Sequence, residues 1–198
     1  MSLAAVNLLV LTACSQSSTS ETESTTAVVA DMTTTAPSDI SSSDETTSEF
    51  TLTSSAMSDG GTLPVQFTCD GASQSPPLSW SGAPAGTKSF AVLMDHSPGP
   101  NDWHWYWTLW GIDSSVSSIS AGSAGSAVVG TNSVNGQLVY APPCSKGPGD
   151  KAYTFTVFAL SDAPAISNAQ SIDRTALLAT VEGITLGTAS MTVTYTRS

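Results

Sequence analysis

The stretch "SFAVLMDHSPGPNDWHWYWTLWGI", residues 89–112, joins two apolar segments through a loop that is rich in proline and glycine. The segments, 89–95 and 103–112, are dominated by Val, Leu, Phe, Tyr and Trp, which favour extended strands. Alternation along the second segment predicts two faces, one with His104, Tyr106 and Thr108 and the other with Trp103, Trp105 and Trp107. We therefore expect two consecutive strands, with three tryptophans gathered on one side of the second.

Other segments between residues 50 and 198 have the same strand-like composition, and one segment has a helical pattern. The further strand candidates are 50–57, 152–160 and 189–197. The helical candidate is 171–183. Ser171 or Asp173 can cap its start, and Gly183 can end it. Its apolar stripe consists of Leu177, Leu178 and Val181. We expect residues 50–198 to form a mainly β domain with one or two short helices near the C-terminus.

The first fourteen residues, "MSLAAVNLLVLTAC", have the character of a lipoprotein signal peptide. The apolar run 3–11 is too short to span a bilayer, and residues 11–14 resemble a lipobox that ends in the lipidated residue, Cys14. One departure is that no Lys or Arg precedes the apolar run. We expect a lipoprotein of the bacterial cell envelope, attached to the membrane through its N-terminal lipid only. Because Ser15 is not the aspartate associated with inner-membrane retention, we expect the outer membrane in a Gram-negative source and the extracellular face otherwise.

Residues 15–49 are mostly Ser and Thr and carry seven acids and no base. A segment of this composition buries too little surface to offset its ordering entropy, so we expect a disordered linker. The remaining nine acids and five bases leave residues 50–198 with a net charge of −4, against −11 for the whole chain. We expect no nucleic-acid partner, because binding to a phosphate backbone requires a basic patch.

Four titratable residues, Asp95, His96, Asp102 and His104, lie within ten positions of one another. Their types suit a divalent metal ion, but their spacing matches no rigid metal-binding motif, and we expect no metal and no cofactor. Ser97 follows His96 directly, yet adjacent side chains diverge and no Gly-x-Ser-x-Gly motif is present, so we expect no enzyme activity. The simpler alternatives are a hydrogen-bonded core residue for His104 and loop residues for His96 and Asp102.

Short motifs along most of this domain resemble the phosphatidylethanolamine-binding protein family, in its bacterial Raf-kinase-inhibitor-like branch. In chain order they are "SPPLSW" at 75–80, "PAGTKSFAV" at 84–92, Asp95 at a strand end, "HW" at 104–105, "GTN" at 130–132, Tyr-x-x-Pro-Cys at 140–144, Tyr153 with "FTVFAL" at 155–160, and "LLATVEGITLG" at 177–187. None of these motifs is decisive alone. Their common order over residues 67–198 carries the resemblance.

The resemblance implies a large central β-sheet, mostly antiparallel, that packs against a smaller sheet. It also implies a small pocket at one end that accepts a phosphate or a similar headgroup. The positions that match the family's pocket are Asp95 for its first aspartate, His104 with its neighbour Trp105 for its histidine, Pro143 and Cys144 in its proline-rich loop, and Tyr153 for its tyrosine.

The chain departs from the family pattern at several pocket positions. His96 and Ser97 replace a proline and the second aspartate, Ser145 stands in place of a proline, and Lys151 replaces a second histidine. Lysine is a permanently charged partner for an anion, whereas histidine titrates near neutral pH. We therefore expect anion binding through His104, Lys151 and Tyr153, with Asp95 ordering the site.

Cys69 and Cys144 are the two cysteines that remain once Cys14 is assigned to lipid. In an exported domain, with both residues in loops that the resemblance places at the pocket border, we expect them to form a disulfide. Two separate buried thiols are the alternative.

The sequence as a whole predicts an exported, lipid-anchored domain that binds a small anionic or phosphorylated ligand. The alternative is a protein-binding module that inhibits an envelope protease or kinase through the rim of the pocket. The sequence does not predict an oligomeric state.

Overall fold

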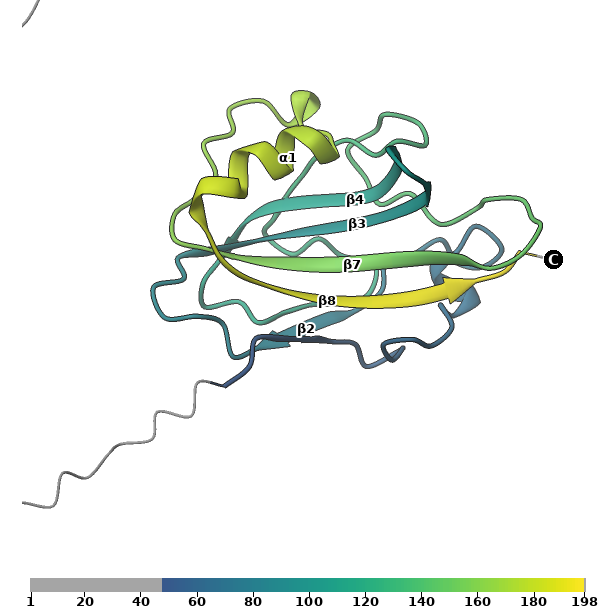
Figure 1. Ribbon diagram of the computed structural model, residues 1–198, viewed down its shortest axis with the longest axis horizontal. Coiled ribbons are helices and arrows are strands. Elements are labelled where there is room, and N and C mark those ends of the chain that lie inside the picture. Colours follow the sequence, from purple (N-terminus) through teal and green to yellow (C-terminus); the bar gives the residue numbers. More distant parts are fainter. Residues whose placement is uncertain (1–47, 198) are drawn as a thin grey trace, which may run out of the picture. The chain divides into compact units, whose positions relative to one another are not determined.

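Two antiparallel β-sheets and one helix form three layers in the described part of the chain, residues 48–197 of a computed structural model (Figure 1). The larger sheet has the strand order β6-β4-β3-β7-β8 and the smaller has β1-β2-β5. The strands are β1 Thr51–Thr53, β2 Leu78–Ser81, β3 Ser89–Gly99, β4 Asp102–Asp113, β5 Ser118–Ile119, β6 Val128–Val129, β7 Lys151–Leu160 and β8 Thr185–Tyr195. The helix is α1 Arg174–Val181, with 3-10 turns η1 Val65–Phe67, η2 Ala169–Ser171 and η3 Glu182–Ile184. The predicted mainly β architecture with a C-terminal helix is confirmed.

The side chains of β3 alternate between two hydrophobic cores. Phe90, Val92 and Met94 pack between the two sheets, whereas Ala91 and Leu93 pack on the side of α1. Because both faces of this strand are covered, its apolar run is uninterrupted. The same alternation, continued past Met94, determines which polar side chains reach the functional site.

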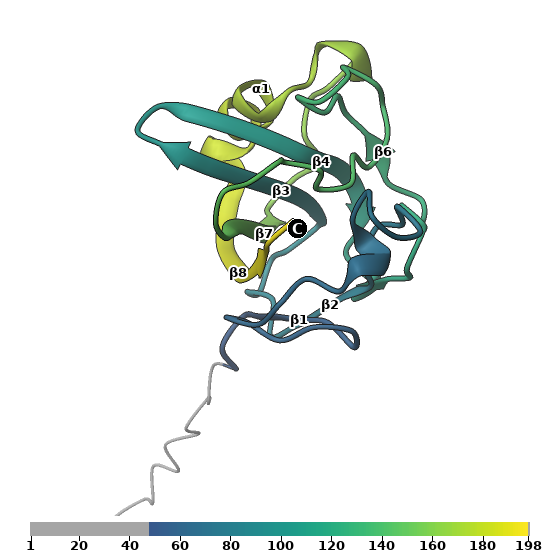
Figure 2. The same cartoon turned by 90° about the vertical axis from the view of Figure 1, so that its right-hand side faces the viewer.

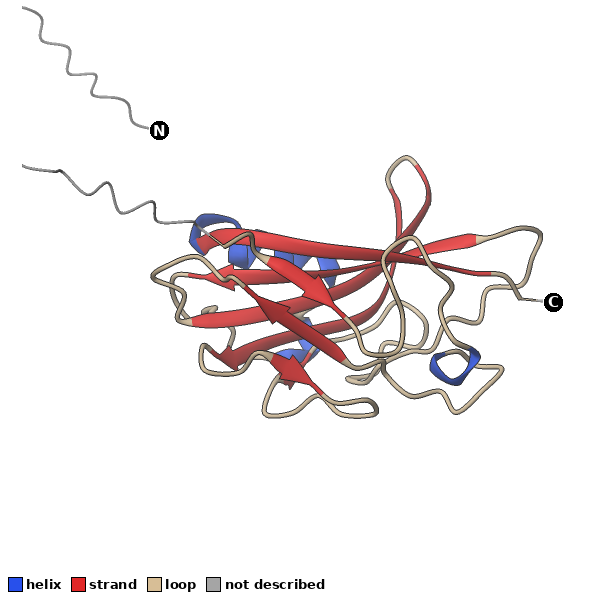
Figure 3. Cartoon of the chain, turned by 90° about the horizontal axis from the view of Figure 1, so that it is seen from below, coloured by secondary structure: helices blue, strands red, loops and turns tan. Residues whose placement is uncertain are grey.

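Strands β3 and β4 form a hairpin whose tip extends beyond the rest of the sheet (Figure 2; Figure 3). A register shift between the pairs Met94–Trp107 and Asp95–Trp105 leaves Tyr106 as an extra residue in β4. Tyr106 and Trp107 therefore both lie in the core between the sheets, while Trp105 packs on the helix side. The predicted strict alternation is wrong from Trp107 onward, because a β-bulge turns the following side chain to the other face.

Helix α1 covers the face of the large sheet that is turned away from the small sheet (Figure 1). Of the two predicted capping residues, Asp173 is the N-cap, and its carboxylate accepts a hydrogen bond from the Ala176 amide at 2.8 Å. Leu177 and Val181 are buried against the sheet. No helix within residues 48–197 is long and apolar enough to cross a membrane. The predicted signal peptide, with Cys14, and residues 15–47 of the predicted linker lie outside the described residues.

Candidate functional site

The polar side chains of the site continue the face of the large sheet that packs against the small sheet. On β7, Phe155 and Val157 lie in the core between the sheets, so Tyr153 and Lys151, two and four positions before Phe155, face the same way. On β3, His96 follows Met94 by two positions and lies opposite His104 of β4. The strand alternation that builds the apolar core thus also brings lysine and histidine together at its open end.

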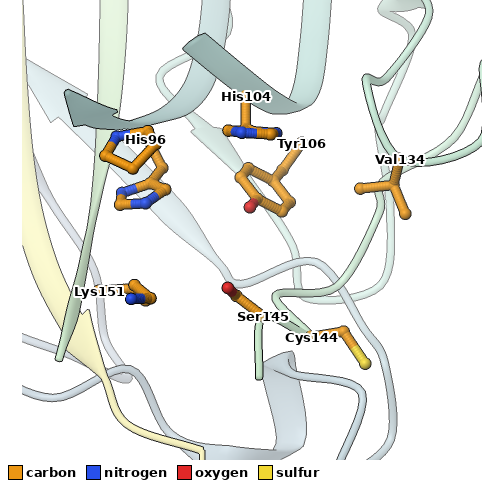
Figure 4. A pocket seen from close by; sticks show the side chains of 8 residues that line it. His96, His104, Tyr106, Val134, Cys144, Ser145 and Lys151 are labelled. Carbon is orange, nitrogen blue, oxygen red and sulfur yellow. The ribbon is translucent and has the colours of Figure 1, made fainter. Parts of the chain in front are cut away.

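Lys151, His96 and His104 all border a cavity of about 380 Å³. It is lined by His96, Pro98, His104, Tyr106, Val134, Cys144, Ser145 and Lys151. Figure 4 shows the His96 ring above Lys151, and the hydroxyls of Tyr106 and Ser145 pointing toward each other. Three groups that carry or can take up positive charge, together with two hydroxyls, therefore converge on one space.

His96 is held in one orientation by the backbone of β7. Its Nδ1 lies 2.7 Å from the carbonyl oxygen of Ala152, and because a carbonyl only accepts, Nδ1 carries the proton. The His96 ring centroid lies 5.3 Å from that of Tyr153 and 6.4 Å from that of His104. The Nε2 atom of His96 is therefore the nitrogen that remains for a ligand.

His104 and Lys151 lie on opposite sides of the cavity and are more accessible. The Nε2 atom of His104 lies 3.4 Å from a carboxylate oxygen of Asp102, and both side chains are about half exposed. The ammonium of Lys151 donates a hydrogen bond to the Pro148 carbonyl at 3.3 Å. Both side chains can reorient toward a ligand, since their present contacts are exposed to solvent.

Tyr153 lies behind the cavity wall and does not line it. Its side chain is fully buried, and its ring packs edge-on against Tyr106 at 5.2 Å. Its hydroxyl has no hydrogen-bond partner among the described residues. Burial, and after it the neighbouring Tyr106, raise the pKa of Tyr153, and burial also raises the pKa of Tyr106. Both phenols therefore stay neutral and can act as hydrogen-bond donors.

Asp95 and Trp105, both predicted as site residues, do not line the cavity. The carboxylate of Asp95 faces the other side of the sheet and accepts a hydrogen bond at 2.6 Å from Nε of Arg174, at the start of α1. The Arg174 guanidinium in turn stacks on Trp103, 3.5 Å from the ring centroid. The reason is strand parity: Asp95 follows the buried Met94 by one position, so it points the opposite way.

The wall formed by Cys144 and Ser145 is fixed by several contacts. A disulfide joins Cys69 to Cys144, and the amide of Cys69 donates to the carbonyl of the buried Pro143 at 3.1 Å. Arg197 donates to the Cys144 carbonyl at 3.2 Å and forms an ion pair with Asp70 at 3.0 Å. A hydrogen bond from Tyr195 and then the charge of Arg197 lower the pKa of Asp70, against an opposing effect of burial. Pro143 therefore supports the wall without lining the cavity.

Sequence reasoning missed three contributors to the cavity, Pro98, Tyr106 and Val134. Pro98 was given no role, Tyr106 was assigned a face but no role, and Val134 comes from a loop without strand periodicity. His96 was predicted only as a secondary candidate. Because every second residue of a strand faces the same side, the buried positions 90, 92 and 94 would have placed His96 on the cavity side. The loop residues that line the cavity had no comparable signal in the sequence, because side chains in loops do not alternate between two faces.

The arrangement of the four clustered titratable residues does not resemble a metal centre or a hydrolase site. Among residues 48–197, no group of three or more His, Cys, Asp or Glu side chains lies close enough to hold a metal ion. The hydroxyl of Ser97 is exposed and donates to the Gly99 carbonyl at 2.7 Å, away from the cavity lining. The chemistry that the cavity offers is therefore hydrogen-bond donation and positive charge.

Comparisons with known proteins place these features in context. A family model described as phosphatidylethanolamine-binding protein matches residues 53–196. A UPF0098 protein of Chlamydia muridarum is 32% identical over 149 residues, covering 73% of this chain and 97% of the relative. Another, from Methanothermobacter thermautotrophicus, is 33% identical over 151 residues, with 74% and 98% covered.

Two solved structures share the fold. A putative phosphatidylethanolamine-binding protein homologue from Chlamydia trachomatis, CT736, superimposes with a TM-score of 0.69 at 28% identity, over 75% of this chain and 98% of that one. Escherichia coli YbcL, described as a new member of the mammalian PEBP family, gives a TM-score of 0.69 at 27% identity, with 76% and 100% covered.

Proposed function

This chain belongs to the phosphatidylethanolamine-binding protein family, and from this premise we propose that its cavity binds a small anionic or phosphorylated ligand. One observation carries the proposal. Lys151, His96 and His104 converge on a single cavity of about 380 Å³ from three neighbouring strands. Ammonium and imidazolium groups form short, charge-assisted hydrogen bonds with phosphate oxygens.

Each side chain has a role that follows from its position. Lys151 supplies a permanent positive charge, and His96 and His104 supply imidazole nitrogens to the same cavity. The hydroxyls of Tyr106 and Ser145 donate to the remaining oxygens of the ligand (Figure 4). Tyr153 supports the rings of His96 and Tyr106 from behind and contacts no ligand itself.

Titration calorimetry with inorganic phosphate tests this proposal. Lys151→Ala removes a charge-assisted hydrogen bond, so we expect phosphate affinity to fall about tenfold or more, and His104→Ala to weaken binding in the same direction. Lys88→Ala is the matched control, because it deletes the same charge from an exposed position beside the opposite end of β3. Absence of phosphate binding by the wild type, or equal losses in both lysine variants, would overturn the proposal.

We also propose that the domain is exported and anchored through a lipid on Cys14. The support is the apolar run and the Leu-Thr-Ala-Cys sequence at 11–14. Metabolic labelling with a fatty acid in a bacterial host tests it. The wild type should incorporate label, and Cys14→Ser should not, whereas equal labelling of the two would contradict the proposal.

A second candidate function is binding of an envelope protein, such as a protease or kinase, through the rim of the cavity. The observation that favours it is the apolar side chain of Val134, which lines the cavity and is 56% exposed. Capture of a partner by the wild type and equally by His104→Ala would favour this function. Loss of capture on Val134→Asp with unchanged phosphate binding would separate the rim from the cavity.

A further inference from the structure

Within residues 48–197, the side chains that line the cavity include none that could form an ion pair with a cationic ligand group. None of its eight lining residues is Asp or Glu, while Lys151, His96 and His104 are basic. Tyr106 is the single phenol or indole ring in the lining, and it packs edge-on against Tyr153. The cavity therefore offers an ammonium group neither a carboxylate nor an aromatic cage.

The acidic residues nearest in sequence are turned away or occupied. Asp95 lies on the opposite face of the sheet, paired with Arg174. Asp102 is 61% exposed, lies beside His104 and does not line the cavity. Asp150, next to Lys151, is exposed and accepts a hydrogen bond from the hydroxyl of Thr196. A ligand ammonium placed in the cavity would meet the like charge of Lys151, and no lining residue carries a carboxylate to offset it.

The geometry of His96 leaves its Nε2 as the atom through which a second proton would donate to an anion. Its Nδ1 is already committed to the Ala152 carbonyl, so a second proton must enter at Nε2. The titratable or charged groups that surround this ring are Tyr153 behind it, His104 with its partner Asp102 across from it, and Lys151 in the same cavity. A bound anion adds negative charge inside the cavity, next to this ring, and would favour the imidazolium form.

We infer that the cavity selects phosphate monoesters that carry no ammonium group over zwitterionic ones, and takes up a proton as it binds them. This inference rests on the proposed anion-binding function and adds the ligand class and the role of His96. The determinant is the placement of His96 in the cavity and of Asp95 outside it.

Two ligands that differ at one group test the selectivity. Glycerol 3-phosphate and phosphoethanolamine share a phosphate monoester, but only the second carries an ammonium. We expect the wild type to bind glycerol 3-phosphate about tenfold more tightly by calorimetry at neutral pH. His96→Asp should narrow or reverse this ratio by adding a carboxylate. If His96→Asp fails to fold, Ser145→Asp, on the half-buried loop wall, should narrow the ratio in the same way. Lys88→Ala should leave the ratio unchanged.

Proton uptake is measured separately with inorganic sulfate, which does not titrate near neutral pH. Calorimetry in buffers of different ionisation enthalpy should show uptake of part of a proton on sulfate binding by the wild type. We expect His96→Gln to reduce this proton uptake. Any uptake that remains in the variant would come from His104. Uptake unchanged by His96→Gln would overturn the coupling to His96.

The outcomes separate this inference from the function on which it rests. If none of the phosphate compounds or sulfate binds, the proposed function itself fails. If inorganic phosphate binds but phosphoethanolamine binds as well as or better than glycerol 3-phosphate, the proposed function stands and the selectivity is wrong.

Discussion

At the scale of single residues, the pair Asp95 and His96 determines the character of the site. They are adjacent in β3, so their side chains leave opposite faces of the sheet. The carboxylate of Asp95 pairs with Arg174 beneath α1, and the imidazole of His96 enters the cavity. Exchanging the two faces would give the cavity an acid in place of a base.

Asp95 is therefore expected to act on stability and not on ligand binding. Its ion pair with Arg174 is largely buried, with side-chain exposures of 11% and 17%, so Asp95→Asn leaves a poorly solvated guanidinium without its partner. We expect unfolding in urea to show a loss of about 2–4 kcal/mol. At temperatures where the variant is folded, its phosphate affinity should change less than about threefold.

The control for this experiment is Asp102→Asn, at the exposed pair with His104. We expect its stability to change by less than about 1 kcal/mol. A large loss of phosphate affinity in folded Asp95→Asn would support the alternative that Asp95 orders the site through contacts formed only with ligand.

At the scale of elements, the strands that were predicted are those with long apolar runs. β3, β4 and β7 start within one residue of their predicted starts at 89, 103 and 152. The short strands β2, β5 and β6 were not predicted, and 50–57 forms a strand only at Thr51–Thr53. Strands of two to four residues are defined by pairing with a neighbour, which a local pattern does not contain.

Helix α1 supplies a test at this scale, because the sequence offered two capping residues. The Asp173 side chain accepts from the Ala176 amide, whereas Ser171 ends the preceding 3-10 turn and its hydroxyl donates to the Asn168 carbonyl. We expect Asp173→Ala to lower the free energy of unfolding by about 1 kcal/mol and Ser171→Ala by about 0.5 kcal/mol or less. Thermal or urea unfolding measures both, and the reverse order would contradict the assignment of the cap.

At the scale of the whole molecule, the disulfide connects stability with the site. Cys69 follows η1, and Cys144 belongs to a loop that lines the cavity 75 positions later in the chain. The bridge thus closes a large part of the domain into one covalent loop. It also ties the cavity wall at Cys144 to the segment that follows η1.

Removing this bridge should affect stability and binding together. For a loop of this length, the chain-entropy model gives a loss of about 4 kcal/mol in unfolding free energy for the double variant Cys69→Ser/Cys144→Ser. We expect weaker phosphate binding as well, because the loop of Cys144 and Ser145 loses its tether. Reduction of the wild type with dithiothreitol should reproduce both effects, and the same reductant on the double variant is the control. Unchanged phosphate affinity in the folded double variant would show that the tether does not shape the wall.

Periodicities along the chain were enough to predict the mainly β class, the strands with long apolar runs, and the helix with its apolar side. The sequence also identified His104 and Lys151, both of which line the cavity. The folded structure was needed to show that Asp95 pairs with Arg174, that Tyr153 lies behind the cavity wall, and that Tyr106 and Val134 complete this wall. The bulge at Tyr106 and the partner of each buried charge depend on residues that are far apart in the chain. A shift of one residue in a strand moves the side chains that follow from one face of the sheet to the other, so these features could not be predicted from local periodicity.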